Sequence, residues 1–160
     1  LPPRRGRPLL EMPEGSSAEV VHLEDEPASV YRQAADAGIL AGARMRILRR
    51  GADFLRVAVE DRQCQLPLAV AAAIQVEPCE APPVVKPLSS LSRGESGRIA
   101  SLSATLIGGE RRRMLDLGLV PGTRIERDFD SMFGSPTAYR VRGAVIALRR
   151  EQAERIFLEA

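Results

Sequence analysis

The chain has 160 residues, of which 44% are hydrophobic and 28% charged, with a formal net charge of +2. This length and apolar content allow one domain or two small ones, each with a buried core. Cys64 and Cys79 lack the spacing of a zinc or redox motif, and the longest apolar run, residues 66–74, is too short to span a bilayer. Composition therefore predicts a cytoplasmic protein without membrane insertion, a disulfide framework or a Cys-rich metal site.

The first predicted elements are a strand at residues 18–23 and a helix after it. Pro27 suits the first position of this helix, because its fixed φ is already helical and it has no N–H to leave unpaired. Gly38 is expected to end the helix, since glycine adopts the left-handed conformation without steric cost. Gly42 then supplies a turn into the next strand.

Alternating apolar and polar residues predict the strands that follow. Residues 54–59 and 139–142 show this alternation, which is typical of antiparallel strands with one buried face. In each case a turn, a further strand, a short helical turn and a last strand come next. About five short strands with one helix after the first indicate a mainly β fold, of the kind that forms a small barrel.

The chain repeats itself with a period near 80 residues. The segment from Asp36 to Met45 matches the segment from Asp116 to Ile125, so that Gly118 and Gly122 repeat the roles of Gly38 and Gly42 as structural turn residues. The Pro-rich stretch between the two copies favours an extended connector. We therefore predict four parts: a Pro/Arg-rich linker at 1–7, a first domain at 8–78, a Pro-rich linker at 79–86 and a second domain at 87–160.

The motifs of the two copies resemble known families. Arg113 to Ile125 and Ile146 to Ile156 closely resemble the FeoA-type SH3-like domain. The first copy, with residues 25–27 opening its helix and residues 38–42 closing it, is similar to the C-terminal SH3-like domain of the iron-dependent repressors related to diphtheria toxin repressor. The resemblance implies two tandem small SH3-like β-barrels, each with a helix inserted after the first strand.

The function implied by this resemblance is that of a C-terminal regulatory or interaction region of a metal-dependent transcriptional repressor. In such proteins a winged helix reads DNA and a second domain binds metal and dimerises, and neither is expected in this piece, which begins at Leu1. The region would bind no cofactor alone, while Fe²⁺ or Mn²⁺ would bind the full-length protein. Its expected partners are the upstream metal-binding and dimerisation domain or a second subunit.

The resemblance also implies an ancillary metal site at the start of the first helix. An acidic residue and a polar one three positions on help complete such a site, with the other ligands coming from the absent domain, and Glu26 and Ser29 stand nearest to those positions. Serine is a poor ligand. The alternative interpretation is that the acidic run 24–26 only favours the helix N-terminus through its dipole.

The second copy is more basic than the first. Residues 87–160 hold 12 basic and 9 acidic side chains, whereas residues 8–86 hold 8 and 12. Such an excess could attract DNA phosphates or an acidic partner, although a solvated face is the simpler interpretation and no aromatic residue alternates with these arginines. The candidate basic patch consists of Arg111, Arg112, Arg113, Arg149 and Arg150.

No pattern in the chain indicates an enzyme or a conventional peptide-binding groove. Catalysis would need a nucleophile with a base or paired acids, and the single histidine, His22, lies on a predicted strand. Proline-recognition grooves are lined by aromatic side chains, of which this chain has few. The alternative function left open is a tandem FeoA-like cytosolic accessory protein for ferrous iron transport.

Overall fold

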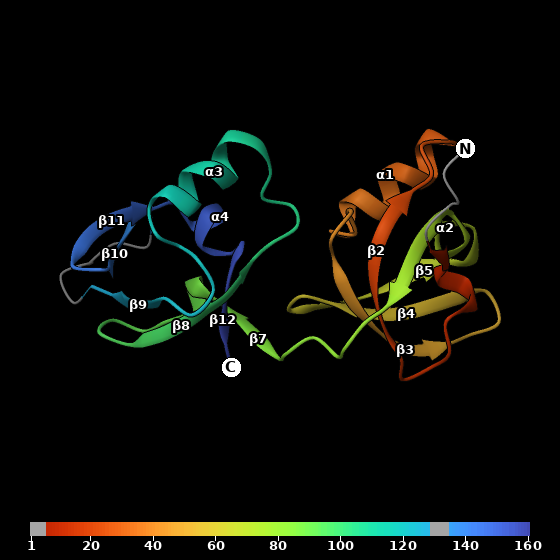
Figure 1. The fold of residues 1–160 in the computed structure, drawn as a ribbon, viewed down its shortest axis with the longest axis horizontal. Coiled ribbons are helices and arrows are strands. Elements are labelled where there is room, and N and C mark those ends of the chain that lie inside the picture. The colour runs from red at the N-terminus through yellow and green to blue at the C-terminus, as the bar shows by residue number, and fades with distance from the viewer. Residues whose placement is uncertain (1–5, 129–134) are drawn as a thin grey trace. The chain divides into compact units, whose positions relative to one another are not determined.

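The computed structural model describes residues 6–128 and 135–160, and the chain divides into two compact units, Leu1–Pro83 and Val84–Ala160. Each unit consists of a six-stranded antiparallel sheet with two short α-helices and one 3₁₀ turn (Figure 1). The predicted mainly β fold class is therefore confirmed. Within the described residues, no helix is long and apolar enough to cross a membrane.

The elements of the first unit follow one another with short connections. They are β1 (Arg7–Pro8), η1 (Leu9–Glu11), β2 (Ser17–Leu23), α1 (Ala28–Asp36), β3 (Arg44–Arg50), β4 (Phe54–Val59), β5 (Arg62–Pro67), α2 (Leu68–Ala73) and β6 (Ile74–Pro78).

The second unit repeats the same series. Its elements are β7 (Val85–Pro87), η2 (Leu88–Ser90), β8 (Ser96–Leu102), α3 (Gly108–Asp116), β9 (Arg124–Arg127), β10 (Thr137–Val141), β11 (Ala144–Leu148), α4 (Arg150–Ala153) and β12 (Ile156–Glu159).

The two sheets have the same strand order. In the first unit it is β1-β6-β2-β3-β4-β5, and in the second, read from the corresponding end, β7-β12-β8-β9-β10-β11. The last long strand of each unit returns to pair with the strand that precedes the larger helix. The repeat seen in the sequence is thus a repeat of topology as well.

Each unit also contains a strand that the sequence analysis did not predict. Arg7 and Pro8 pair with β6, and Val85 to Pro87 pair with β12, so both strands extend into segments that were assigned to linkers. Proline cannot donate to a strand ladder and is tolerated at an edge. With these edge strands counted, the larger helix follows the second strand of its unit and not the first.

Successive side chains along a strand point to opposite faces of the sheet, and those on one face fill the core. Leu55, Val57 and Val59 of β4 are at most 2% exposed, and the intervening side chains are more exposed. In the second unit the buried cluster draws on strands, helices and the 3₁₀ turn alike. It consists of Leu88, Leu91, Ile99, Leu102, Leu106, Met114, Leu119, Ile125, Tyr139, Val141, Leu148, Ala153, Ile156 and Leu158.

Candidate functional site

The four predicted turn glycines form two copies of one backbone frame. Gly38 has φ 79° and Gly118 has φ 91°, each two residues beyond its helix. The next residue, Ile39 or Leu119, donates its N–H back to the helix, at 2.9 Å and 3.1 Å respectively. This is the Schellman arrangement, which satisfies carbonyls at the helix end and needs a left-handed residue that glycine supplies.

Gly42 and Gly122 fix the turn that follows. Their φ angles are 90° and 89°, and each donates its N–H to the strand beside it, to the Val20 carbonyl at 2.8 Å or the Ile99 carbonyl at 2.7 Å. A positive φ at the third position of the turn is what a type II turn requires. These glycines therefore set the path from helix to strand in both units.

The acidic run before α1 lies at the surface of the first unit. Glu26 and Ser29 are exposed, and Glu24 lies 4.0 Å from the imidazole of His22. Within the described part of the chain, no group of three or more His, Cys, Asp or Glu side chains lies close enough together to hold a metal ion. Glu26 and Ser29 would thus supply at most two of the ligands that Fe²⁺ or Mn²⁺ needs.

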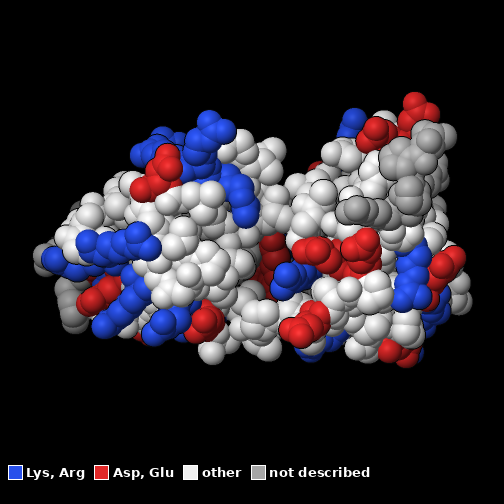
Figure 2. Space-filling view, viewed as in Figure 1, with Lys and Arg blue, Asp and Glu red and all other residues white. Residues whose placement is uncertain are grey.

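The five arginines predicted as a basic patch do not form one uniform surface. Arg111 is half-buried, and its Nη1 donates to the carbonyls of Ser103 and Leu106, each at 3.1 Å. Arg112 and Arg113 are exposed on α3, over which Figure 2 shows basic side chains gathering. Arg111 therefore holds the loop before α3 in place, whereas its neighbours face solvent.

The remaining two arginines of that set begin α4. Arg149 is exposed, and its backbone N–H donates to Gln152 at 2.9 Å. The Arg150 Nε lies 3.5 Å from Glu154, one turn along the helix, and both side chains are exposed enough for this pair to be weak. Arg150 has a further role that the sequence analysis did not predict, because it lines a pocket.

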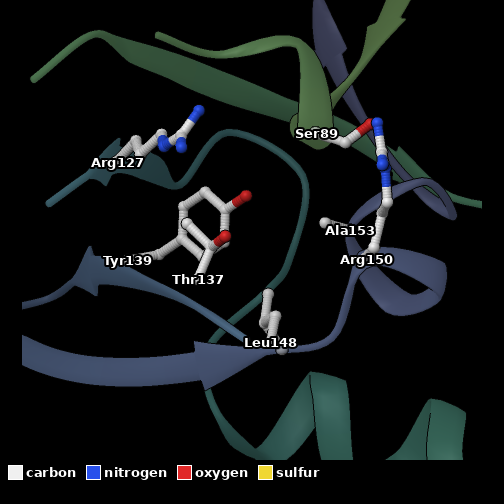
Figure 3. A pocket seen from close by; sticks show the side chains of 7 residues that line it. All are labelled: Ser89, Arg127, Thr137, Tyr139, Leu148, Arg150 and Ala153. Carbon is white, nitrogen blue, oxygen red and sulfur yellow. The ribbon is translucent and has the colours of Figure 1, made fainter. Parts of the chain in front are cut away.

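This pocket lies within the second unit and has a volume of about 190 Å³. Figure 3 shows side chains from several elements converging on it, with Arg127 entering from β9, Tyr139 and Thr137 from β10 and Arg150 from α4. None of the described lining residues is acidic. They are Ser89, Arg127, Thr137, Tyr139, Leu148, Arg150 and Ala153.

The environment of Arg127 is unusual for an arginine. Its Nη1 donates to the Leu91 carbonyl at 2.8 Å, but its buried Nε has no hydrogen-bond partner in the described part of the chain. Burial raises the pKa of the neighbouring Tyr139, and the positive charge of Arg127 opposes that shift. The phenol is therefore neutral at physiological pH and can donate a hydrogen bond into the pocket.

The two cysteines are separate from this pocket. Cys64 on β5 and Cys79 beyond β6 are free thiols, and both are partly buried. Burial raises the pKa of each thiol, with a nearby arginine opposing the shift in both cases. A raised pKa leaves little thiolate at neutral pH, so these groups are weak nucleophiles.

Most pocket residues were not singled out from the sequence, because polar residues on short strands are ordinarily solvent-facing. The repeat does contain a signal, because Arg127 of the second copy aligns with the apolar Ile47 of the first. A charged residue at a position that is apolar in the other copy indicates that this position has a different role in the second copy.

Comparison with known proteins identifies the fold of both copies. The FeoA domain model matches residues 7–78 and 86–160. A solved manganese-dependent transcriptional repressor in complex with manganese is 27% identical, with a TM-score of 0.46. That match covers 49% of this chain and 39% of the repressor chain, so this chain spans well under half the length of that protein.

Two further solved structures are also similar. Iron(II) transport protein A from Clostridium thermocellum is 23% identical, with coverage of 95% of this chain and 86% of that one and a TM-score of 0.42. The FeoA protein from Chlorobium tepidum is 29% identical over 46% of this chain and 70% of that chain, with a TM-score of 0.40. None of the curated proteins matches the chain.

Proposed function

The chain belongs to the FeoA domain family, and from this premise we propose that it is the C-terminal regulatory region of a metal-dependent transcriptional repressor. It acts there as a protein-interaction module, in the cytoplasm and without catalysis of its own. Its two FeoA domains contact the upstream metal-binding and dimerisation domain or a second subunit. DNA is bound only by the winged-helix domain of that larger protein.

The observation that carries this proposal is the surface of α3 in the second unit. Ile107, immediately before the helix, is 66% exposed, and Leu115, eight residues on, is 41% exposed. Ile107 precedes the helix in an extended conformation and Leu115 lies in its last turn, so α3 and its entry both present apolar side chains to solvent. Arg112, one helical turn before Leu115, is also exposed, so this surface is mixed apolar and basic, which suits an acidic protein partner.

The mechanism is a shift between conformations of the repressor dimer. A domain that binds the dimer more tightly in its DNA-competent state raises the population of that state. By linkage, the same contact raises the apparent affinity for the activating metal. The FeoA domains thus tune the metal concentration at which the operator is occupied, without reading a base pair.

Operator binding by the full-length protein tests this mechanism. We expect the pair of substitutions Ile107→Ser and Leu115→Ser to shift the midpoint Mn²⁺ concentration for operator binding by about fivefold or more. Val84→Ser removes another exposed apolar side chain, one that lies outside α3, and should leave the midpoint unchanged. An unchanged midpoint in the α3 variant, or an equal shift in both variants, would contradict the proposal.

The same proposal includes an ancillary metal site that Glu26 helps to complete. The supporting observation is that Glu26 and Ser29 are both exposed at the start of α1, where ligands from another domain can reach them. In the full-length protein, Glu26→Ala should weaken Mn²⁺ binding at that site, while Glu14→Ala, distant from α1 in sequence, should not. Equal affinities in the two variants would leave Glu26 with a role at the helix N-terminus alone.

The family match itself favours a second candidate, a tandem FeoA protein that assists ferrous iron transport. The encoding sequence upstream of Leu1 separates the two. A winged helix followed by His- and Glu-rich metal motifs would establish the repressor, whereas a start codon beside Leu1 would establish the accessory protein.

A further inference from the structure

The pocket of the second unit occupies a place that is packed with apolar side chains in the first. Strand pairing fixes the correspondence, because Ile47 pairs with Val57 in one unit and Arg127 pairs with Tyr139 in the other. Backbone hydrogen bonds agree with it, since the carbonyl of Ile47 accepts from Gly15 at 2.8 Å and that of Arg127 from Gly94 at 2.9 Å.

The remaining pocket positions follow from the same register. Leu55 pairs with Leu66 as Thr137 pairs with Leu148, and the 3₁₀ turns and short helices begin at equivalent residues. Five apolar residues of the first unit are thereby replaced by polar ones in the second. The replacements are Leu10 by Ser89, Ile47 by Arg127, Leu55 by Thr137, Val57 by Tyr139 and Leu68 by Arg150.

Three of these replacements, by Arg127, Thr137 and Tyr139, fall at positions that are fully buried in the first unit, whereas Ser89 is half-buried and Arg150 is exposed. Ile47, Leu55 and Val57 have no exposed surface in the first unit, so the same frame is stable when these positions are apolar. A guanidinium and hydroxyls at these positions remove the stabilisation that buried apolar side chains give, and these polar groups need hydrogen-bond partners. The lining Leu148 and Ala153 remain apolar, as Leu66 and Ala71 are in the first unit.

Packing within the second unit does not account for the half-buried Arg127 and its buried Nε. Its one hydrogen bond is to the Leu91 carbonyl, and the equivalent carbonyl in the first unit, that of Met12, accepts from Arg50 at 2.8 Å. The fold can therefore satisfy that carbonyl with an arginine at another position. The Nε of Arg127 has no hydrogen-bond partner among residues 6–128 and 135–160, although buried donors are ordinarily paired.

The shape and chemistry of the pocket select a small oxyanion. Among the described residues, two guanidiniums and three hydroxyl groups line it and no carboxylate does, and arginine pairs well with phosphate or carboxylate oxygens. Its volume of about 190 Å³ lies below the range of pockets that hold drug-sized molecules. Hydroxyl and guanidinium donors that come from separate elements match a tetrahedral anion better than a flat one.

We propose that this pocket binds a phosphate group, with Arg127 and Arg150 supplying charge and Ser89 and Tyr139 supplying hydroxyl donors. The inference rests on the second unit alone and is independent of the function proposed for the whole chain. Phosphate binding would give the second unit a ligand that the first unit, with Ile47 and Leu55 in the same place, cannot hold.

Titration of the full chain with inorganic phosphate tests the proposal. NMR monitors the arginine Nε–H signals, and calorimetry measures the affinity. Phosphate should shift the Arg127 Nε–H signal, a readout that needs no variant. Arg127→Ile installs the residue of the first unit and should weaken phosphate binding by about tenfold or more, since a charged hydrogen-bonding group is lost. Arg149→Gln, which removes an equal charge from an exposed neighbour, should change the affinity less than about twofold.

A second variant and a second ligand complete the experiment. The variant separates loss of binding from misfolding, and the ligand separates a phosphate ester from free phosphate. Ser89→Leu fills the pocket with the residue of the first unit and should also abolish binding while leaving the charge unchanged. Glycerol 3-phosphate binding more tightly than inorganic phosphate would indicate a phosphate ester as the ligand, and the reverse would indicate the free anion. Equal weakening by Arg127→Ile and Arg149→Gln, an unmoved Arg127 signal, or acetate binding as tightly as phosphate would each overturn the proposal.

Discussion

Replacing Gly122 by alanine should destabilise the second unit through backbone strain alone. The φ of Gly122 is 89°, in the left-handed region, and an added Cβ would meet no atom within 4 Å. An L-residue in that region costs about 1–2 kcal/mol, because its Cβ crowds the following carbonyl oxygen. We therefore expect Gly122→Ala to lower the free energy of unfolding of this unit by about 1–2 kcal/mol.

Gly109 provides a matched control in the same unit. It lies in the first turn of α3, its φ is not positive, and an added Cβ would again meet nothing within 4 Å. Alanine restricts the unfolded chain without straining such a position, which stabilises proteins by about 0.4–1 kcal/mol. One substitution at two equally open sites should thus have opposite effects.

Thermal unfolding followed by NMR reports each unit separately and measures both effects. A domain of this size changes its Tm by about 4–8 °C for each kcal/mol, so Gly122→Ala should lower the Tm of the second unit by at least about 4 °C. Gly42→Ala should reproduce the effect in the first unit, since Gly42 has φ 90° and equally open space. Shifts of the same sign for Gly122→Ala and Gly109→Ala would refute the backbone explanation.

Two further predictions concern the second unit. Arg111→Ala should lower its free energy of unfolding by about 1–2 kcal/mol, because the carbonyls of Ser103 and Leu106 lose a charged donor, whereas the exposed Arg112→Ala should change it by less than about 0.5 kcal/mol in urea unfolding. The raised pKa of Tyr139 means that, above its unfolded value of 10.0, the unfolded chain loses a proton that the folded chain keeps. The contribution of Tyr139 to stability is therefore fully present below pH 10 and is lost as the pH rises through the folded pKa. Tyr139→Phe should remove this loss. An identical dependence of stability on pH in the two proteins would contradict the assignment of the loss to Tyr139.

Turn chemistry was the part of the fold that the sequence predicted best. Gly38, Gly42, Gly118 and Gly122 stand where a left-handed residue is required, and that requirement is local, so a single sequence reveals it. The duplication was visible for the same reason, since these turns recur at a constant spacing. The alternation at residues 54–59 likewise predicted the buried face of β4.

The edge strands and the pocket depend on pairing between distant segments. Arg7 and Pro8 become a strand only because β6 lies beside them, and a two-residue stretch has no periodicity to detect. Arg127 and Arg150 lie 23 positions apart and line one pocket only because of the register of β9, β10 and β11 and the position of α4 after them. Side-chain spacing cannot reveal such a site, although comparison of the two copies can.

The basic patch shows how the same residue type takes different roles in one short segment. Arg111, Arg112 and Arg113 are adjacent, yet only Arg111 donates to buried carbonyls, because successive helical residues point in different directions. The sequence indicated an excess of positive charge in the second copy, but not which arginines are structural and which remain available to a partner.

Duplication explains how the second unit can carry a polar pocket within so small a domain. A unit of this size buries little surface, so the buried Thr137 and the buried, unpaired Nε of Arg127 among the described residues lower its stability. Bound phosphate would restore some of it by mass action, because a ligand that binds only the folded state stabilises that state. Phosphate should therefore raise the Tm of the second unit and leave that of the first unchanged, since Ile47 and Leu55 fill the equivalent space there. An equal rise in both units would show that phosphate acts as a stabilising salt and not as a ligand.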